Sequence, residues 1–482
     1  MLFVAAGLAL SLAGLLFYAV FTQSDSTPNA AQPTPSATAP SYPAHWDHRI
    51  APIAKVASRL RDLKFRHPVP VRFLPSGKFE KSLVSDQKLT TSDKVDIRHA
   101  TGLLRAFGLI SGDVNLVRAY RGFRGGATLA YYSYKDDSIT VRGSKVTPAI
   151  RATLVHELTH VLQDQHFRIG ARLHRLQHQD AGKGPSTSAS SVMDAIIEGD
   201  ADRIEHLYDN SLPPQQQQAL TEGQRVETAQ ARKRLVGVPP IVITLQTSPY
   251  TLGEGLVQTV EAGGGNAAVD RLLRTPPTHE ASLLDPFRYL DGHSGATRVA
   301  TPALKAGEKQ FDSGEFGVLT LYFMLAERLP LEQALAAADA WGGDAYVGYE
   351  RGGTTCARAS FVGQTPSGTN LIDSALQQWA AAAPGSSASV QQVGGRVLFE
   401  SCDPGTALQA GQDDSEAALT LVGTRSGLGA VLVRSGASHP AARCLAGRLV
   451  ASYTTAQLDD PAFGRNDPAV QAQIQQLAAG CR

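Results

Sequence analysis

Two histidines and a glutamate in the run HELTHVLQDQH, residues 156–166, have the types and the spacing of a metal-assisted hydrolytic site. His156 and His160 are four residues apart, so on a helix they lie about 40° from each other around the axis and both rings can reach one metal ion. Glu157 follows the first histidine, where its carboxylate can take a proton from a water molecule at the metal. The pentad HELTH therefore predicts a metal site with its own general base.

The sequence around the pentad predicts that it lies on a helix. There is no Pro or Gly between residues 151 and 165, and both residue types interrupt helices. The apolar residues of the run recur at helical spacing: Leu154, Val155, Leu158, Val161 and Leu162. This pattern predicts a half-buried helix. The alternative is a core helix whose two histidines only form hydrogen bonds.

A zinc ion in a hydrolytic site usually has three protein ligands, so HELTH leaves one ligand to be found. His166 follows His160 by six residues, which is the spacing of the third histidine in the metzincin pattern HExxHxxGxxH. The glycine that lets the chain leave the helix in that pattern is replaced by Gln163. In a continued helix His166 would point about 80° away from the direction of His156, so we expect a surface histidine there.

The other candidate ligand lies in the segment DAIIEGDADRIE, residues 194–205. Glu198 and Asp202 are four residues apart and share a helix face. A carboxylate that is buried against a second helix needs a partner, and a zinc ion or a ligand histidine would provide one. Glu198 is therefore the predicted third ligand, and Asp202 is the predicted acceptor for the free ring N–H of a ligand histidine. The alternative is a solvated acidic helix face, for which Asp200 and Glu205 argue.

The combination of HELTH with EGDAD resembles the gluzincin zinc peptidases, whose signature is HExxH with a downstream ExxxD. The resemblance implies that His156, His160 and Glu198 bind zinc, that Glu157 is the general base, and that Asp202 supports a ligand histidine. Further stretches between about residues 60 and 350 are similar to a poorly characterised group of bacterial neutral zinc metallopeptidases: LKFRHPVPVRFL, TLVHELTHVLQDQHF, IIEGDAD, SPYTLGEG, TPPTHEASLLDP and WGGDAY.

A hydrolytic zinc site also needs a donor for the oxyanion that develops in the transition state. Gluzincins supply it from a Tyr or a His beyond the third ligand, and the resemblance carries this role to Tyr250, His279 or His293. We choose Tyr250. The alternative for each of the three is a packing aromatic residue or a surface histidine.

The N-terminal sequence predicts export from the cytoplasm. Residues 2–21 are almost wholly apolar and long enough to cross a membrane. No clear small-residue cleavage site follows directly, which favours an uncleaved anchor over a removed signal peptide for segment 1–22. Residues 23–44 are rich in Pro, Ser, Thr and Ala and predict a linker. We therefore expect the body of the chain outside the cytoplasm, either anchored to the membrane or secreted.

All four cysteines lie in the last third of the chain, at Cys356, Cys402, Cys444 and Cys481. Their spacing contains no CxxC, and an even number behind an export segment favours two disulfides. Three pairings are possible, of which sequence order favours Cys356 with Cys402 and Cys444 with Cys481. Free buried thiols are the alternative.

The composition is that of a globular protein that does not bind nucleic acid. The formal net charge is +1 over 482 residues, and no basic stripe is interleaved with aromatic residues. We therefore expect a peptide or protein substrate and, through the N-terminal segment, a membrane as partners.

Periodicity predicts a helix over residues 46–64, an extended edge segment over 67–74 and a helical region near 90–110. Two extended runs, 127–134 and 138–142, predict a hairpin just before the HELTH helix. Residues 187–210 are expected to carry Glu198 on a helix, and 215–233 predict a polar linker or an exposed helix. Beyond Cys356, Val397–Phe399, Leu419–Val422 and Ala430–Val433 are predicted to be strands, with Gly427 among the residues that interrupt them.

Together these patterns predict a mostly helical α+β fold. A zincin-like metallopeptidase domain over residues 45–355 would carry the active-site helix and a small edge sheet, and residues 356–482 would form an accessory region with the four cysteines. The predicted function is a membrane-anchored or secreted zinc-dependent peptidase. The alternative is an anchored peptide-binding or scaffold protein that retains a zincin fold.

Overall fold

The structure, a computed structural model, describes residues 42–83, 90–180, 187–408, 411, 414–460, 462–465 and 467–481. The predicted N-terminal anchor and most of the linker lie outside the described residues. The helices of the described part are α2 (Ala51–Arg61), α3 (Ser76–Leu83), α4 (Thr91–Ala106), α5 (Leu116–Ala127), α6 (Pro148–Phe167), α7 (Ile169–Asp180), α8 (Ala189–Ser211), α9 (Pro214–Arg234), α10 (Pro240–Arg274), α11 (Ala281–Leu284), α12 (Phe287–Leu290), α13 (Val318–Ala326), α14 (Leu331–Asp339), α15 (Pro366–Ala381), the 3₁₀ helix η1 (Pro384–Ser386), α16 (Ser415–Arg434), α17 (His439–Ser452), α18 (Thr455–Leu458) and α19 (Pro468–Ala479). The strands are β1 (Val71–Leu74), β2 (Ala130–Ser133), β3 (Ser138–Arg142), β4 (Glu308–Gly314), β5 (Trp341–Arg351), β6 (Thr354–Gly363), β7 (Ala388–Val393) and β8 (Arg396–Cys402).

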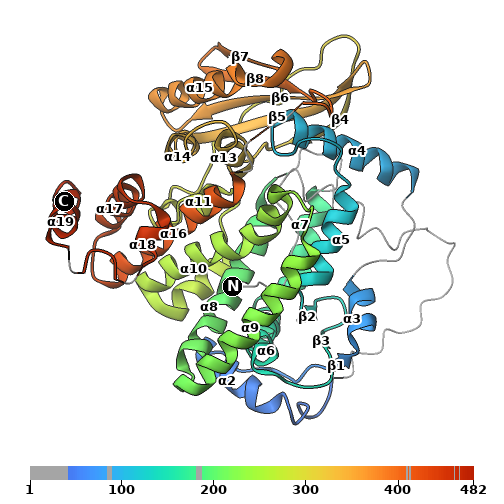
Figure 1. The fold of residues 1–482 in the computed structure, drawn as a ribbon, viewed down its shortest axis with the longest axis vertical. Helices are drawn as coiled ribbons and strands as arrows, with labels where there is room; N and C mark the ends of the chain where they lie inside the picture. The colour runs from blue at the N-terminus through green and yellow to red at the C-terminus, as the bar shows by residue number, and fades with distance from the viewer. Residues whose placement is uncertain are drawn as a thin grey trace.

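The strands form two separate small sheets, one at each end of a helical middle layer (Figure 1). The first has the order β1-β3-β2, with β1 parallel and β2 antiparallel to β3. The second is antiparallel with the order β4-β5-β6-β8-β7. This confirms the predicted α+β class with a mostly helical chain. It also places the predicted hairpin β2–β3 directly before α6, with β2 at the sheet edge.

Helix α6 carries the HELTH pentad and is buried along most of its length. Thr147 caps its start by accepting a hydrogen bond from the Ile150 N–H (3.2 Å), and Pro148 occupies the first turn, where no N–H is needed. The left-handed residue Arg168 ends it. Every residue from 152 to 163 is buried, so the expectation of a half-buried helix was wrong. The helix is covered because it packs against α2, α8 and β2.

Helix α8 connects the two main hydrophobic clusters of the molecule. Its first half, including Met193 and Ile197, belongs to the large cluster that extends to α10 and the five-stranded sheet. Its second half, through Ile204 and Tyr208, belongs to the smaller cluster around α2, α6 and the three-stranded sheet. Glu198 lies between these halves, so both clusters fix its position against α6.

Two glycines let α8 and α10 approach each other at backbone distance. A Cβ atom on Gly253 of α10 would lie 1.7 Å from the carbonyl oxygen of Ala195, and one on Gly199 of α8 would lie 2.1 Å from the carbonyl carbon of Gly253. Both distances are far below van der Waals contact. The residue that follows the Glu198 position is therefore restricted to glycine by the neighbouring helix.

The cysteines form the two disulfides favoured by sequence order, Cys356–Cys402 and Cys444–Cys481. The first joins paired positions of strands β6 and β8, and the second joins α17 to the end of the chain beyond α19. Two disulfides and no free cysteine indicate a protein of an oxidising, extracytoplasmic compartment.

The predicted strands at Leu419–Val422 and Ala430–Val433 were wrong, because both segments belong to α16. The buried positions Ala418, Val422, Ser426 and Ala430 recur every four residues, which is helical spacing. Two glycines of α16, Gly423 and Gly429, lie at close contacts with neighbouring elements: a Cβ on Gly423 would lie 2.7 Å from the Thr251 side chain of α10. Val397–Phe399, in contrast, lies in strand β8 as predicted.

Helix α16 is also the one helix in the described ranges that is long and apolar enough to cross a membrane. It packs along α10 and contributes to the large cluster, as a core helix does. The division of the chain into a domain of residues 45–355 and a region of residues 356–482 stays a prediction; its boundary falls inside strand β6.

Candidate metal centre

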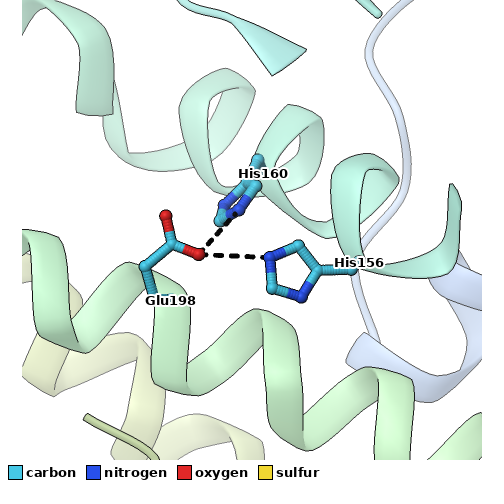
Figure 2. Close-up of side chains that lie close together, drawn as sticks. All are labelled: His156, His160 and Glu198. Carbon is cyan, nitrogen blue, oxygen red and sulfur yellow. Dashed lines mark hydrogen bonds and ion pairs between the residues drawn. The ribbon is translucent and has the colours of Figure 1, made fainter. Parts of the chain in front are cut away.

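Three side chains from α6 and α8 converge at one buried point (Figure 2). Nε2 of His156 lies 3.1 Å from Oε2 of Glu198, and Nε2 of His160 lies 3.4 Å from the same oxygen. The ligand atoms of the three residues all lie within 4.8 Å of one another, and each residue is only 1% exposed. His156, His160 and Glu198 therefore form a group that could hold a metal ion.

The tautomer of His160 is set by Gln163, one helical turn further along α6. The Gln163 amide nitrogen donates to the Ile197 carbonyl (2.9 Å) and to Oδ2 of Asp200 (3.0 Å), which orients the amide. Its Oε1 is then the acceptor that lies 3.0 Å from Nδ1 of His160. Nδ1 of His160 must carry the proton, so the lone pair of Nε2 points to Glu198. The sequence analysis did not assign this role to Gln163. It noted only that Gln163 stands where the metzincin pattern has a glycine.

The ring of His156 faces two carboxylates on its other side. Nδ1 lies 3.1 Å from Oδ1 of Asp202 and 3.4 Å from Oε2 of Glu205. A proton on Nδ1 would face these carboxylates and would leave Nε2 for a metal. The structure thus places Asp202 beside His156, one of the two histidines for which it was the predicted acceptor, and Glu205 joins it there.

The carboxylate of Glu157 is held by the edge strand of the small sheet. Its Oε2 accepts a hydrogen bond from the backbone N–H of Tyr132 in β2 (2.8 Å). Its Oε1 is buried and has no hydrogen-bond partner among the described residues. One oxygen is therefore fixed while the other is free to exchange a proton. Tyr132 contributes only its backbone N–H to this hydrogen bond, so no sequence pattern could have indicated it.

Burial and charge shift the acidity of these groups in different directions. Burial raises the pKa of Glu157 to about 7, against the opposing influence of the two histidines. Burial also raises the pKa of Asp202 to about 6. Burial alone would raise the pKa of Glu198, but the charges and hydrogen bonds of His160 and His156 outweigh it, so that pKa lies below its ordinary value. Glu198 is thus the carboxylate that stays ionised.

The donor set fits a zinc ion. Two imidazole nitrogens and one carboxylate oxygen are the ligands of many catalytic zinc sites, which keep a further position open. Nε2 of His160 and Oε1 of Glu157 are buried without a hydrogen-bond partner in the part of the chain that the structure describes. Buried polar atoms without a partner are costly, and a metal ion with its water would satisfy these two.

Asp200 and His166 differ in how they relate to this centre. Asp200 is fully buried rather than solvated: its carboxylate forms ion pairs with Arg61 (2.7 Å) and Arg203 (2.9 Å), so the interpretation as an acidic solvated face was wrong at this position. Arg61 comes from α2, at a sequence distance that no local pattern bridges. His166 is not in the metal group, since its Nε2 lies 2.8 Å from the Lys64 carbonyl oxygen.

Two tyrosines flank the centre. Tyr250 of α10 is 1% exposed, and its ring centroid lies 6.3 Å from that of His156. Tyr134, just after β2, has its ring centroid 6.3 Å from that of His160, and its buried hydroxyl has no hydrogen-bond partner among the described residues. His279, in contrast, is engaged by Glu315 at 3.2 Å. The role of Tyr250 as oxyanion donor stays a prediction.

The two candidate third ligands can be separated by metal retention. We expect Glu198→Ala to weaken zinc binding by more than the roughly 10–100-fold that is typical for the loss of a group behind a ligand, because a direct ligand is removed. His166→Ala, the matched control on the same helix, should bind zinc as the wild type does. Competition with a chromogenic zinc chelator measures both affinities. Retention of zinc by Glu198→Ala together with its loss from His166→Ala would reverse the assignment.

The chain was also compared with known proteins. No protein-family model matches it, no curated protein matches it, and no solved structure matches it. The buried group of two histidines and a glutamate at HxxxH spacing is therefore the feature from which a function has to be inferred.

Proposed function

We propose that this protein is a zinc-dependent peptidase that works outside the cytoplasm. The observation that carries the proposal is the convergence of His156, His160 and Glu198 from two helices, with Glu157 beside them as an intact candidate base. A site kept only for structure has no use for a buried glutamate with one unpartnered oxygen at this position.

Each residue has a distinct part in the proposed reaction. A zinc ion held by His156, His160 and Glu198 would supply Lewis-acid chemistry, which acidifies water and polarises a carbonyl group. Glu157 takes a proton from the attacking water at Oε1 and passes it to the leaving amine, while the Tyr132 N–H keeps the carboxylate oriented. Asp202 and Gln163 hold the two imidazoles in the tautomers that leave Nε2 free.

The edge strand β2 supports a peptide as the substrate. Strand β2 is at the end of its sheet, and the Tyr132 N–H on its unpaired side points to Glu157 of α6. That N–H is already bonded to Glu157, so an extended peptide would pair with the remaining backbone groups of this edge and would lie along the catalytic helix. Pairing by backbone hydrogen bonds selects a polypeptide without fixing its side chains.

An unbiased peptide-library digest tests the proposal. We expect the purified full chain to cleave peptides, to lose this activity after chelation, and to regain it on addition of zinc. A chain that binds zinc but cleaves no peptide in the library would contradict the peptidase proposal and favour the alternative of a peptide-binding protein. Mass spectrometry of the products detects cleavage at any peptide bond, whatever side chains the enzyme prefers.

A further inference from the structure

A second candidate site lies in a cavity between α4 and α5, the consecutive helices at the right of Figure 1. The cavity has a volume of about 690 Å³, within the range of roughly 300–1,000 Å³ of small-molecule sites. None of its lining residues belongs to the metal centre. The cavity is therefore separate from the residues of the proposed peptidase chemistry.

The lining is strongly basic in a chain whose charges are otherwise balanced. The whole chain has 45 basic and 44 acidic residues. The cavity is lined by five basic residues and one acidic residue: Lys94, Arg98, Arg105, Arg118, Arg121 and Asp113. Such a local excess of positive charge attracts anions.

Three of these cations have no counter-ion in the described part of the protein. Arg105 is held by Asp403 through two contacts of 2.8 and 2.6 Å, and Arg98 lies 3.2 Å from Glu350. Lys94, Arg118 and Arg121 form no ion pair within the described ranges of the chain. Three cations thus face the cavity with only Asp113 against them.

The spacing of the cations places them on the helix faces that line the cavity. Arg118 and Arg121 are three residues apart and share one face of α5, while Lys94 and Arg98 are four apart and share one face of α4. Like charges at these spacings repel each other, so an anion between the two helices relieves repulsion on both. Guanidinium groups also match the oxygen geometry of phosphate.

The uncharged lining residues indicate that the ligand also has an apolar part. Ile97, Val114, Leu116 and Val117 line the same cavity, so part of its surface is apolar. We propose that the cavity binds a phosphate ester with a small apolar body. A phosphate monoester carries up to two negative charges and three acceptor oxygens, which suits three unpaired cations better than a single carboxylate does. The ligand can be a soluble phosphate ester or the headgroup of an anionic phospholipid.

Isothermal titration of the full chain in non-ionic detergent with phenyl phosphate tests the site. We expect saturable binding with one site per chain, weaker at high salt, and no binding of benzyl alcohol, which lacks the phosphate. The double variant Arg118→Gln/Arg121→Gln should bind phenyl phosphate at least about tenfold more weakly, because it loses two charged donors. Both side chains are exposed, so circular dichroism and zinc content should stay unchanged.

The matched control is Arg225→Gln, an exposed arginine of α9 that pairs with Glu222 at 2.8 Å and lies outside the cavity. It should bind phenyl phosphate as the wild type does. Dihexanoyl phosphatidic acid separates the sources: displacement of phenyl phosphate by it, but not by dihexanoyl phosphatidylcholine, identifies a lipid headgroup, and no displacement identifies a soluble ester. Failure of both phosphate probes to bind, or equal binding by the double variant, would overturn the proposal.

Discussion

Replacement of Glu157 by Gln is expected to lower the rate of peptide hydrolysis by about 10³-fold while the protein keeps its zinc. General-base catalysis contributes roughly 10²–10⁴-fold, and an amide cannot take the proton that Oε1 of Glu157 would accept. The amide has the shape of the carboxylate and can still accept the hydrogen bond from the Tyr132 N–H, so the fold should stay intact. The measurement is kcat/KM for a peptide from the library digest, with zinc content determined on the same samples.

The matched control for this prediction is Glu222→Gln, the same chemical change at an exposed position of α9. This variant should hydrolyse the peptide at the wild-type rate. A zinc-loaded Glu157→Gln protein with wild-type kcat/KM would show that Glu157 is not the base, whatever binds the metal.

Replacement of Gly253 by Ala is expected to have the largest effect on stability. The added Cβ would lie 1.7 Å from the carbonyl oxygen of Ala195, and a backbone atom cannot move aside as a flexible side chain can. Overpacking typically costs about 1–3 kcal/mol, and we expect the upper end, about 3 kcal/mol or more, since α8 must move away from α10. Glu198 moves with α8, so zinc affinity should fall together with the melting temperature.

Gly427→Ala is the control for a glycine inside a packed helix. Apart from its chain neighbours and the backbone of its own helix, no atom lies within 4 Å of a Cβ at this position of α16. Alanine is favoured over glycine in a helix by about 1 kcal/mol. We therefore expect an unchanged or slightly higher melting temperature for this variant. If thermal unfolding shows equal stability for Gly253→Ala and Gly427→Ala, the backbone contact between α8 and α10 does not stabilise the protein.

The helices of the candidate metal centre could be predicted because their signals are local. The spacing of His156 and His160 and the carboxylate pair of the EGDAD segment each lie within one or two helical turns, where period alone determines which side chains share a face. HELTH supplies only two of the three ligands that a zinc site usually has, and Glu198 was therefore predicted as the third. The same reasoning correctly set His166 aside, since a continued helix turns it away.

The groups that complete the centre could not be predicted, because they come from distant parts of the chain. The Tyr132 N–H is a backbone donor, and Arg61 reaches Asp200 across 139 residues. The burial of α6 on all sides depends on α2, α8 and β2 together. Local apolar periodicity predicts that one face of a helix is buried. It does not show whether distant elements also cover the other faces.

The error in α16 has a different physical origin. Gly427 suggested an interruption between short strands, since glycine weakens both regular structures. In the structure Gly423 and Gly429 lie where a Cβ would meet Thr251 and Phe287 at under 3.0 Å. Glycine is favoured both in turns and where two helices pack closely. The local sequence of α16 does not show which helix will pack against it, so the two cases could not be distinguished.

The proposed function requires that His156, His160 and Glu198 hold one zinc ion on which peptide cleavage depends. Elemental analysis of the full chain, purified without added metal, tests it most directly when cleavage is assayed on the same sample. We predict about one zinc per chain, and loss of both zinc and cleavage in the double variant His156→Ala/His160→Ala. Zinc at the same stoichiometry in that double variant, or a wild-type chain that cannot be loaded with zinc, would contradict the proposed function.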